Sequence, residues 1–323
     1  MKTRQFSLAI VLTVAFVMFI CESSWAQGYE GKKILFINSY HKGYDWSDGI
    51  ERGVISVLKD TGIELKIFRM DTKNNTSEEF IRAKGRQAKM LIERFKPDVV
   101  ITSDDNAFKH VIRPYYRDAE LPVVFCGLNW DASIYDAPYK NTTGMIEVAL
   151  IPRLIEYLKQ YASGDRIGHI AAEVLTARKE GTYYRKLFKL NIKERYVKTM
   201  AEWKDAFIAI QEETDILIVG NNAGILDWDI AEAKAFAEEN TKIPSGTIYT
   251  WMMPYALLGL AKVEEEQGEW AARAALRILD GTPPSEIPLA KNKKGRVILN
   301  LTIAEKLGII FSPALLKNAE ILD

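Results

Sequence analysis

Residues 98–106 read DVVITSDDN, a short apolar run that ends abruptly in small, acidic and amide residues. Residues 215–223, DILIVGNNA, repeat this pattern in the second half of the chain. Two buried parallel strands can look alike simply because both are apolar. Here the polar endings also correspond, and each half carries a Pro-led strand-like run that ends at a tryptophan, Trp130 or Trp251. The sequence therefore indicates two similar α/β units, with ligands expected at the carboxyl ends of their strands.

Strand-like and helical segments alternate along most of the chain, which predicts parallel sheets with right-handed crossover helices. The expected strands lie near 34–38, 63–70, 99–102, 123–126, 143–148, 166–174, 196–199, 216–219, 246–249 and 297–301. We expect two lobes, each built from two parts of the chain. The N-terminal lobe spans 30–146 and is completed by about 252–285, and the C-terminal lobe spans 147–251 and is completed by about 286–323.

The first residues have the pattern of an export signal. Two basic residues precede an apolar run over residues 6–20, and small residues then surround Trp25. Because a membrane span needs about 20 residues, we expect a signal peptide over 1–26, cleaved after Ala26, and a periplasmic protein. A retained anchor is the alternative. Lipidation at Cys21 is not expected, since Ile20 is too bulky for that processing site.

Composition excludes some classes of partner. The chain has 43 basic and 43 acidic residues, and loss of the leader leaves 41 and 42. A near-neutral protein has no long-range attraction to nucleic acid or to an anionic membrane. The mature chain keeps one cysteine, Cys126, within an apolar run, so it forms no intramolecular disulfide. We expect a soluble monomer that binds no nucleic acid.

The loop after the first strand carries the strongest ligand-binding candidates. Aromatic faces stack on planar or apolar ligands, and their polar tips and neighbours orient those ligands. In a purely structural interpretation, Asp45 or Ser47 caps a helix and Trp46 packs inward. That interpretation does not account for the other aromatic residues of the loop. We predict ligand contacts from Ser39, Tyr40, His41, Tyr44 and Trp46.

Polar and aromatic residues follow the other strands as well. One carboxylate of the Asp104–Asp105 pair is expected to cap the next helix, which leaves the other free to accept a hydrogen bond from an ammonium or hydroxyl group. Asn221 and Asn222 take the corresponding place in the second half, as a neutral amide wall. The remaining predicted contacts are Ser103, Asn106, Gly127, Asn129, Trp130, Glu173, Tyr183, Trp251 and Tyr255.

Signatures of catalysis are absent from the sequence. There is no Gly-x-Ser-x-Gly elbow, His-Glu-x-x-His pair, phosphate-binding loop, cysteine pair or Gly-x-Gly-x-x-Gly fingerprint. The three histidines, His41, His110 and His169, are far apart in the sequence. We expect neither an enzyme nor a metal or other cofactor. The rival hypothesis is a secreted α/β hydrolase that uses Asp104 or Asp105.

Five stretches carry a resemblance to a known family: ILFINSYH (34–41), SDDNA (103–107), LPVVFCG (121–127), ILDGTPP (278–284) and LNL (299–301). In these stretches the chain resembles the periplasmic substrate-binding proteins of ABC transporters, of the tryptophan- and tyrosine-binding type, which also occur as sensor modules of histidine kinases.

This resemblance implies a type I periplasmic-binding-protein fold: two Rossmann-like lobes, a three-stranded hinge and a ligand enclosed between them. It also implies a pocket lined by 39–46, 103–106 and 127–130. The expected ligand is a small organic solute, aromatic or amino-acid-like, and the expected partner is an ABC permease or a membrane sensor protein. Many relatives carry an acid where this chain has Asn222, a position suited to a ligand's amino group.

Overall fold

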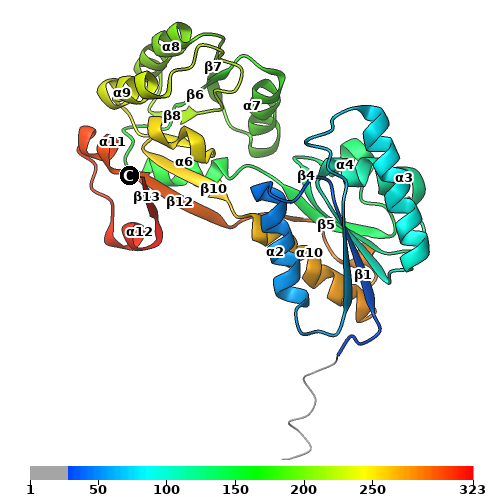
Figure 1. Ribbon diagram of the computed structural model, residues 1–323. Helices are drawn as coiled ribbons and strands as arrows, with labels where there is room; N and C mark the ends of the chain where they lie inside the picture. Colours follow the sequence, from blue (N-terminus) through cyan, green and yellow to red (C-terminus); the bar gives the residue numbers. More distant parts are fainter. Residues whose placement is uncertain (1–27, 323) are drawn as a thin grey trace, which may run out of the picture.

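Two sheets, each covered by helices, form two lobes in the computed structural model (Figure 1). The structure describes residues 28–322, and the predicted signal peptide over 1–26 lies outside the described residues. Among the helices of 28–322, none combines the length and the apolar character that a membrane crossing requires. The predicted α/β architecture with two mostly parallel sheets is confirmed.

The first sheet has the strand order β11-β5-β4-β3-β1-β2, and all of its strand pairs are parallel. Its strands are β1 (Lys33–Asn38), β2 (Glu64–Arg69), β3 (Val99–Ser103), β4 (Val123–Asn129), β5 (Thr142–Glu147) and β11 (Ala290–Lys291). The central strands are almost entirely buried, as expected when helices cover both faces of a parallel sheet.

The helices of the first lobe divide between the two faces of this sheet. The segments are α2 (Asp45–Leu58), α3 (Glu78–Phe95), α4 (Asp104–Ala107), the π-helical turn η1 (Phe108–Ile112), α5 (Arg113–Tyr115), η2 (Ala132–Tyr135), α10 (Glu264–Leu279) and η4 (Pro284–Glu286). One face packs against α3 and η1, and the other packs against α2 and α10. The helices α2 and α10 touch through glycine, because a Cβ on Gly268 would lie 2.0 Å from the carbonyl oxygen of Ile50.

The second sheet has the order β13-β12-β10-β9-β8-β6-β7, and only the β10–β12 pair is antiparallel among the described strands. Its strands are β6 (Ile167–Ala172), β7 (Ile192–Val197), β8 (Ile216–Val219), β9 (Ser245–Thr247), β10 (Leu258–Lys262), β12 (Gly295–Asn300) and β13 (Glu320–Leu322). Its helical segments are α6 (Ile151–Lys159), α7 (Leu175–Phe188), α8 (Met200–Glu213), α9 (Ile230–Asn240), η3 (Thr250–Tyr255), α11 (Leu301–Lys306) and α12 (Pro313–Asn318). The strand expected at 196–199 begins earlier, because β7 is a partly exposed edge strand whose charged residues hide the apolar pattern.

The two sheets share one topology. The order β2-β1-β3-β4-β5 in the first lobe recurs as β7-β6-β8-β9-β10 in the second. The stretches 98–106 and 215–223 therefore occupy equivalent positions, at β3 and at β8. Trp130 and Trp251 likewise follow equivalent strands, β4 and β9. This equivalence explains why the two halves of the sequence resemble each other.

Three short connections join the lobes among the described residues: 148–150, residue 263, and 292–294 (Figure 1). The strand β10 pairs within the second sheet, and the chain then returns to the first lobe as α10. The side chain of Asn292 links two of these connections, because it accepts a hydrogen bond from the Val148 amide at 2.7 Å and donates one to the Val148 carbonyl. The exact lobe boundaries stay a prediction.

Candidate ligand-binding site

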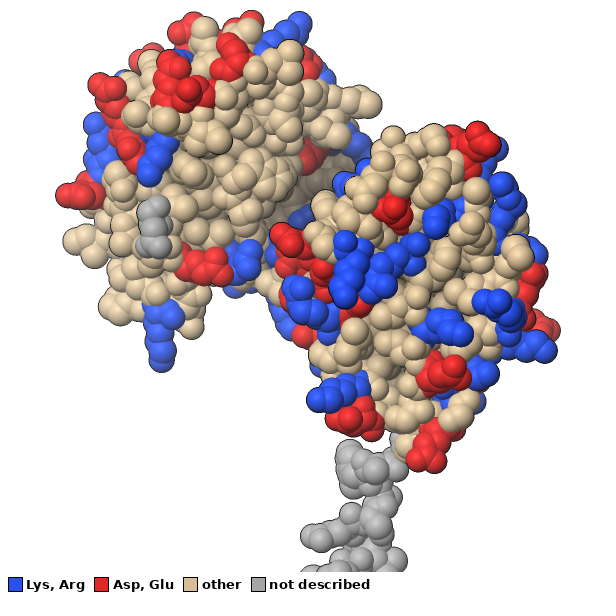
Figure 2. Space-filling view, in the orientation of Figure 1, with Lys and Arg blue, Asp and Glu red and all other residues tan. Residues whose placement is uncertain are grey.

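A cleft of about 690 Å³ opens between the lobes, at the carboxyl ends of both sets of parallel strands. Figure 2 shows the recess between the two rounded lobes, with acidic and basic side chains near its edge. The first lobe contributes Tyr40, Tyr44, Asp45, Trp46, Arg52, Lys73, Asp104, Asn129, Trp130, Glu147 and Glu264, and the second lobe with the hinge contributes Ala149, Glu180, Ile248, Tyr249, Thr250, Trp251, Ala261, Lys262 and Arg296.

One part of the first wall consists of Tyr40, Tyr44 and Lys73. The two rings meet edge to face, with centroids 5.4 Å apart, and the Lys73 ammonium lies 4.8 Å and 5.0 Å from their centroids. A cation over an aromatic face is held by the quadrupole of the ring. Burial raises the pKa of the Tyr40 phenol above its ordinary value, and nearby Asp104 adds to this effect. The aromatic faces here already carry a positive charge from the protein.

The other part of this wall is centred on Asp104. Trp46 donates a hydrogen bond from Nε1 to Asp104 Oδ1 at 2.9 Å. Asp104 is 2 % exposed, and its Oδ2 is buried without a hydrogen-bond partner in the part of the chain that the structure describes. Burial, and then the charge of Glu147, raise the pKa of this carboxyl group well above its ordinary value. Asp104 also has a positive φ of 65°, which is uncommon outside glycine and concentrates at functional sites.

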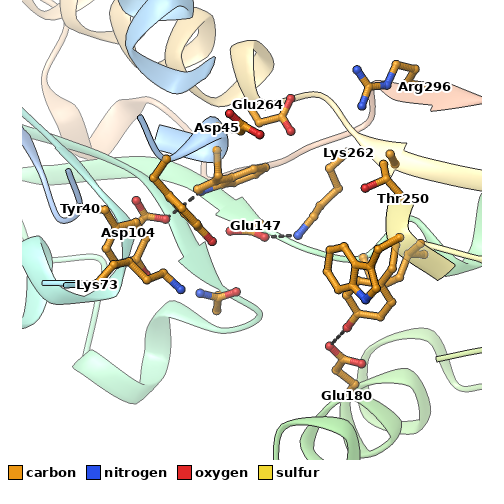
Figure 3. Close-up of a pocket in the computed structure, with 18 of the residues that line it drawn as sticks. Tyr40, Asp45, Lys73, Asp104, Glu147, Glu180, Thr250, Lys262, Glu264 and Arg296 are labelled. Carbon is orange, nitrogen blue, oxygen red and sulfur yellow. Dashed lines mark hydrogen bonds and ion pairs between the residues drawn. The ribbon is translucent and has the colours of Figure 1, made fainter. Parts of the chain in front are cut away.

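The hinge forms the floor of the cleft. The ammonium of Lys262, at the end of β10, pairs with the carboxylate of Glu147, at the end of β5 (Figure 3). The same ammonium lies 5.0 Å from the centroid of the Trp46 ring. Because the Glu147 side chain is 9 % exposed, this pair is largely shielded from solvent. It links two of the strands that lead into the inter-lobe connections.

The second wall is formed by Glu180 on α7 together with Tyr249 and Trp251, which follow β9. The Tyr249 hydroxyl donates to Glu180 Oε1, whereas Glu180 Oε2 is buried and has no partner among residues 28–322. Burial raises the pKa of Glu180. The Tyr249 and Trp251 ring centroids lie 4.6 Å apart, and Trp251 is 55 % exposed towards solvent. This wall therefore offers aromatic surface and one incompletely paired carboxylate.

Part of the predicted set meets in this cleft. The predicted residues that line it are Tyr40, Tyr44, Trp46, Asp104, Asn129, Trp130 and Trp251. Trp130 and Trp251, which follow equivalent strands of the two lobes, line the same cleft from opposite lobes. Trp130 also stacks on Tyr183 of α7, with centroids 5.2 Å apart and planes 4° from parallel. This stack is a direct contact between the lobes.

Several predicted residues lie behind the first wall and support it. The Ser39 hydroxyl donates to the Ser103 carbonyl at 2.6 Å, and Asn106 donates to Thr72 Oγ1 at 2.9 Å. Both carboxylate oxygens of Asp105 are occupied, one by Asn129 and the other by Tyr135. The helix cap expected from this acidic pair is therefore not found among the described contacts. Gly127 lies under Asp104, where a Cβ would come within 3.0 Å of Oδ1.

Other predicted residues are outside the cleft lining. His41 lies 3.7 Å from Asp71 Oδ1, and Glu173 pairs with Arg178. Asn221 accepts a hydrogen bond from the Ala223 amide, in a local turn, and Asn222 is next to it. Tyr255 is buried in the core of the second lobe, where its hydroxyl accepts a hydrogen bond from Trp228. The second wall is thus acidic and aromatic, and the Asn221–Asn222 pair does not line it.

Asp45 lies within the range 39–46 that the family resemblance implies for the pocket. Many other lining residues were missed by the sequence analysis: Arg52, Lys73, Glu147, Ala149, Glu180, Ile248, Tyr249, Thr250, Ala261, Lys262, Glu264 and Arg296. The strand-end rule could have found Lys73 and Glu147, because Lys73 follows β2 and Glu147 is the last residue of β5. Glu180 lies within a helix, and no local sequence pattern distinguishes it from an exposed helical glutamate.

Comparison with known proteins places this geometry in a family. Residues 43–322 match the family model described as ABC transporter substrate binding protein. Among curated protein sequences, none matches the chain significantly.

Solved structures with the same fold cover most of the chain. The ligand-free, open structure of CD0873, a substrate-binding protein with adhesive properties from Clostridium difficile, has a TM-score of 0.69 at 16% identity and covers 90% of this chain and 99% of its own. An ABC domain from Streptococcus pneumoniae in complex with L-Trp has a TM-score of 0.52 at 18% identity, with coverage of 90% and 99%. A periplasmic ribose ABC transporter protein from Conexibacter woesei has a TM-score of 0.55 at 14% identity, with coverage of 88% and 97%. At these identities the similarity establishes the fold alone.

Proposed function

Because the chain belongs to the ABC transporter substrate-binding protein family, we propose that it captures a small organic solute in the cleft between its lobes for import. Proteins of this family bind solutes and work with ABC permeases, and binding rather than catalysis is their activity. The family assignment favours transport over the signalling and hydrolase alternatives. The type I periplasmic-binding-protein fold agrees with this assignment.

The observation that carries the proposal is the position and lining of the cleft. It lies where the carboxyl ends of two equivalent sheets face each other, with the hinge as its floor. Ligands of open α/β sheets bind at this edge. Aromatic rings of both lobes supply apolar surface, and polar groups such as Asn129 and Asp104 would fix the orientation of the solute.

Hinge closure would bring the two walls onto the solute. The lobes are joined by three short connections, which can absorb a rotation without disturbing either sheet. Closure would remove the solute from water and strengthen its polar contacts.

The family assignment supports a location outside the cytoplasm. We expect an extracytoplasmic protein, exported to the periplasm by a cleaved signal peptide over residues 1–26, that acts as a monomer. Its macromolecular partner is an ABC permease, which would recognise the closed form, and it binds no nucleic acid. We propose an aromatic or amino-acid-like solute, because tyrosine and tryptophan side chains line the cleft on both walls, among charged residues.

A denaturation experiment with a metabolite panel tests this function. A ligand that binds only the folded protein stabilises it by RT ln(1 + [L]/Kd), roughly 2.7 kcal/mol at a hundredfold excess over Kd. The Trp46→Ala variant should lose this ligand-dependent gain, because Trp46 lines the cleft and donates to Asp104. Trp270→Ala is the matched control, since Trp270 packs on the core of the first lobe away from the cleft lining. Turnover of a chromogenic substrate without stabilisation by any metabolite would contradict the proposal.

A further inference from the structure

Charge is distributed unequally between the two walls of the cleft. The first wall carries Lys73 beside Asp104, whereas the second wall consists of Glu180, Tyr249 and Trp251 and has no lysine or arginine. The basic lining residues of the second sheet, Lys262 and Arg296, lie on β10 and β12 at the hinge. We name the group Glu180, Tyr249 and Trp251 the Glu180 subsite. Figure 3 shows Glu180 and Asp104 on different sides of the cleft, with the Glu147–Lys262 pair between them.

The carboxylate of Glu180 has unused capacity to accept a hydrogen bond. Tyr249 donates to Oε1, but no described residue donates to the buried Oε2. A buried carboxylate oxygen without a donor is unfavourable, because it has lost its contact with water. The positive charge of Lys262 acts to lower the pKa of Glu180, against the effect of burial. The ammonium of Lys262 is already paired with Glu147, however, and makes no contact that would satisfy Oε2. A donor from outside the chain would complete the site.

The aromatic rings beside Glu180 have no cation of the described chain against them. On the first wall, Lys73 covers Tyr40 and Tyr44. Over Tyr249 and Trp251, in contrast, no lysine or arginine of the described chain is placed as a cation–π partner. A carboxylate next to an accessible aromatic ring, here that of Trp251, is a combination that proteins use to bind organic cations. Asp104, whose buried Oδ2 has no partner among residues 28–322, lines the same cleft from the other lobe.

We propose that the Glu180 subsite binds a positively charged group of the solute, an ammonium or amidinium, with Glu180 as the ion-pair partner and the rings of Tyr249 and Trp251 against its apolar surroundings. This inference rests on the proposed solute-binding function and narrows the solute class to organic cations and zwitterions. In the second lobe, Glu180 and not residue 222 would then recognise the charge of the solute, because Asn222 is neutral and lies outside the cleft lining.

Binding of matched probes by wild type and Glu180→Gln protein tests the inference. The probes are a panel of aromatic and aliphatic amines, the corresponding amino acids, and the corresponding carboxylic acids and alcohols, with tryptamine, L-tryptophan, indole-3-propionate and tryptophol as one set. Compounds with an ammonium group should bind. Glu180→Gln keeps an acceptor for Tyr249 but removes the charge, and it should weaken their binding roughly 10- to 100-fold.

Two further variants separate charge recognition from folding. Glu194→Gln is the matched control, because Glu194 also accepts a hydrogen bond from a tyrosine of the second lobe but does not line the cleft. It should leave probe affinity unchanged. Trp251→Leu should weaken the amines several-fold without unfolding the protein, since Trp251 is more than half exposed.

The outcomes distinguish this inference from the function on which it rests. If only carboxylic acids or alcohols bind, and Trp46→Ala abolishes that binding, the protein captures solutes but the Glu180 subsite is rejected. If amines bind with equal affinity to wild type and Glu180→Gln protein, the subsite is rejected as well. If no compound of the panel binds, the solute-binding proposal and the subsite both fail.

Discussion

His169 should make the second lobe sensitive to acid. This histidine lies in β6, is fully buried, and neither of its ring nitrogens has a hydrogen-bond partner among the described residues. Burial lowers its pKa from 6.5 to about 4, although the carboxylate of Glu194 acts in the opposite direction. The folded protein therefore holds the imidazole neutral, whereas the unfolded chain protonates it near its ordinary pKa.

The sign and size of the effect follow from linkage. Above pH 6.5 the imidazole is neutral in both states, and the folded protein keeps its full stability. As the pH falls from 6.5 towards 4, only the unfolded chain takes up the proton, so the free energy of unfolding decreases. With these two pKa values, the loss is about 2 kcal/mol at pH 5 and about 3 kcal/mol at pH 4. Such a loss is a large fraction of the stability of an ordinary domain.

Urea denaturation followed by tryptophan fluorescence, at pH 7 and at pH 5, measures this contribution. Replacing His169 by methionine removes the titrating group, so His169→Met should lose about 2 kcal/mol less than wild type between these pH values. Ile170→Met is the matched control, because it alters the same buried strand but keeps the imidazole, and it should retain the pH dependence of wild type. Parallel pH dependences of wild type and His169→Met would refute the reasoning, as would a His169 NMR titration near pH 6.5.

Two further predictions concern the hinge and a helix contact. Lys262→Met should lower the free energy of unfolding by about 2 kcal/mol, because it leaves the buried Glu147 carboxylate unpaired, and adding Glu147→Gln should restore most of this loss in a double-mutant cycle. Additive effects of the two substitutions would show that the pair is not coupled. Gly268→Ala should cost at least about 1–3 kcal/mol in urea denaturation, because its Cβ would lie 2.0 Å from the carbonyl oxygen of Ile50, whereas Gly28→Ala should be nearly neutral. Equal stabilities of Gly268→Ala and wild type would contradict the close contact between α2 and α10.

Much of the fold could be predicted from the sequence because its signals are local. Buried parallel strands are apolar over their whole length, so stretches such as 99–102 and 216–219 stand out against their surroundings. Their polar endings mark the carboxyl edge of each sheet, which is why Tyr40, Trp46 and Trp130 could be placed near a ligand site. Edge strands give a weaker signal, and β7 was accordingly placed too late.

Side-chain direction at the strand ends could not be predicted in the same way. Asp104 and Asp105 are adjacent in the sequence, yet Asp104 lines the cleft while Asp105 is held by Asn129 and Tyr135 behind it. Asp104 has a positive φ, and it lies so close to Gly127 of the neighbouring strand that a Cβ there would be 3.0 Å from its Oδ1. The order of residues in the sequence does not show which of the two carboxylates lines the cleft.

The sequence alone determined the two equivalent α/β lobes and the aromatic character of the first wall, because both arise from local patterns of apolar and polar residues. The tertiary structure alone decided the second wall, where α7 brings Glu180 to Tyr249, and the floor, where β5 and β10 bring Glu147 to Lys262. These partners are 69 and 115 residues apart in the chain. The docking of a helix against a distant loop, and the route of the chain through the hinge, set such contacts. Local sequence patterns report neither.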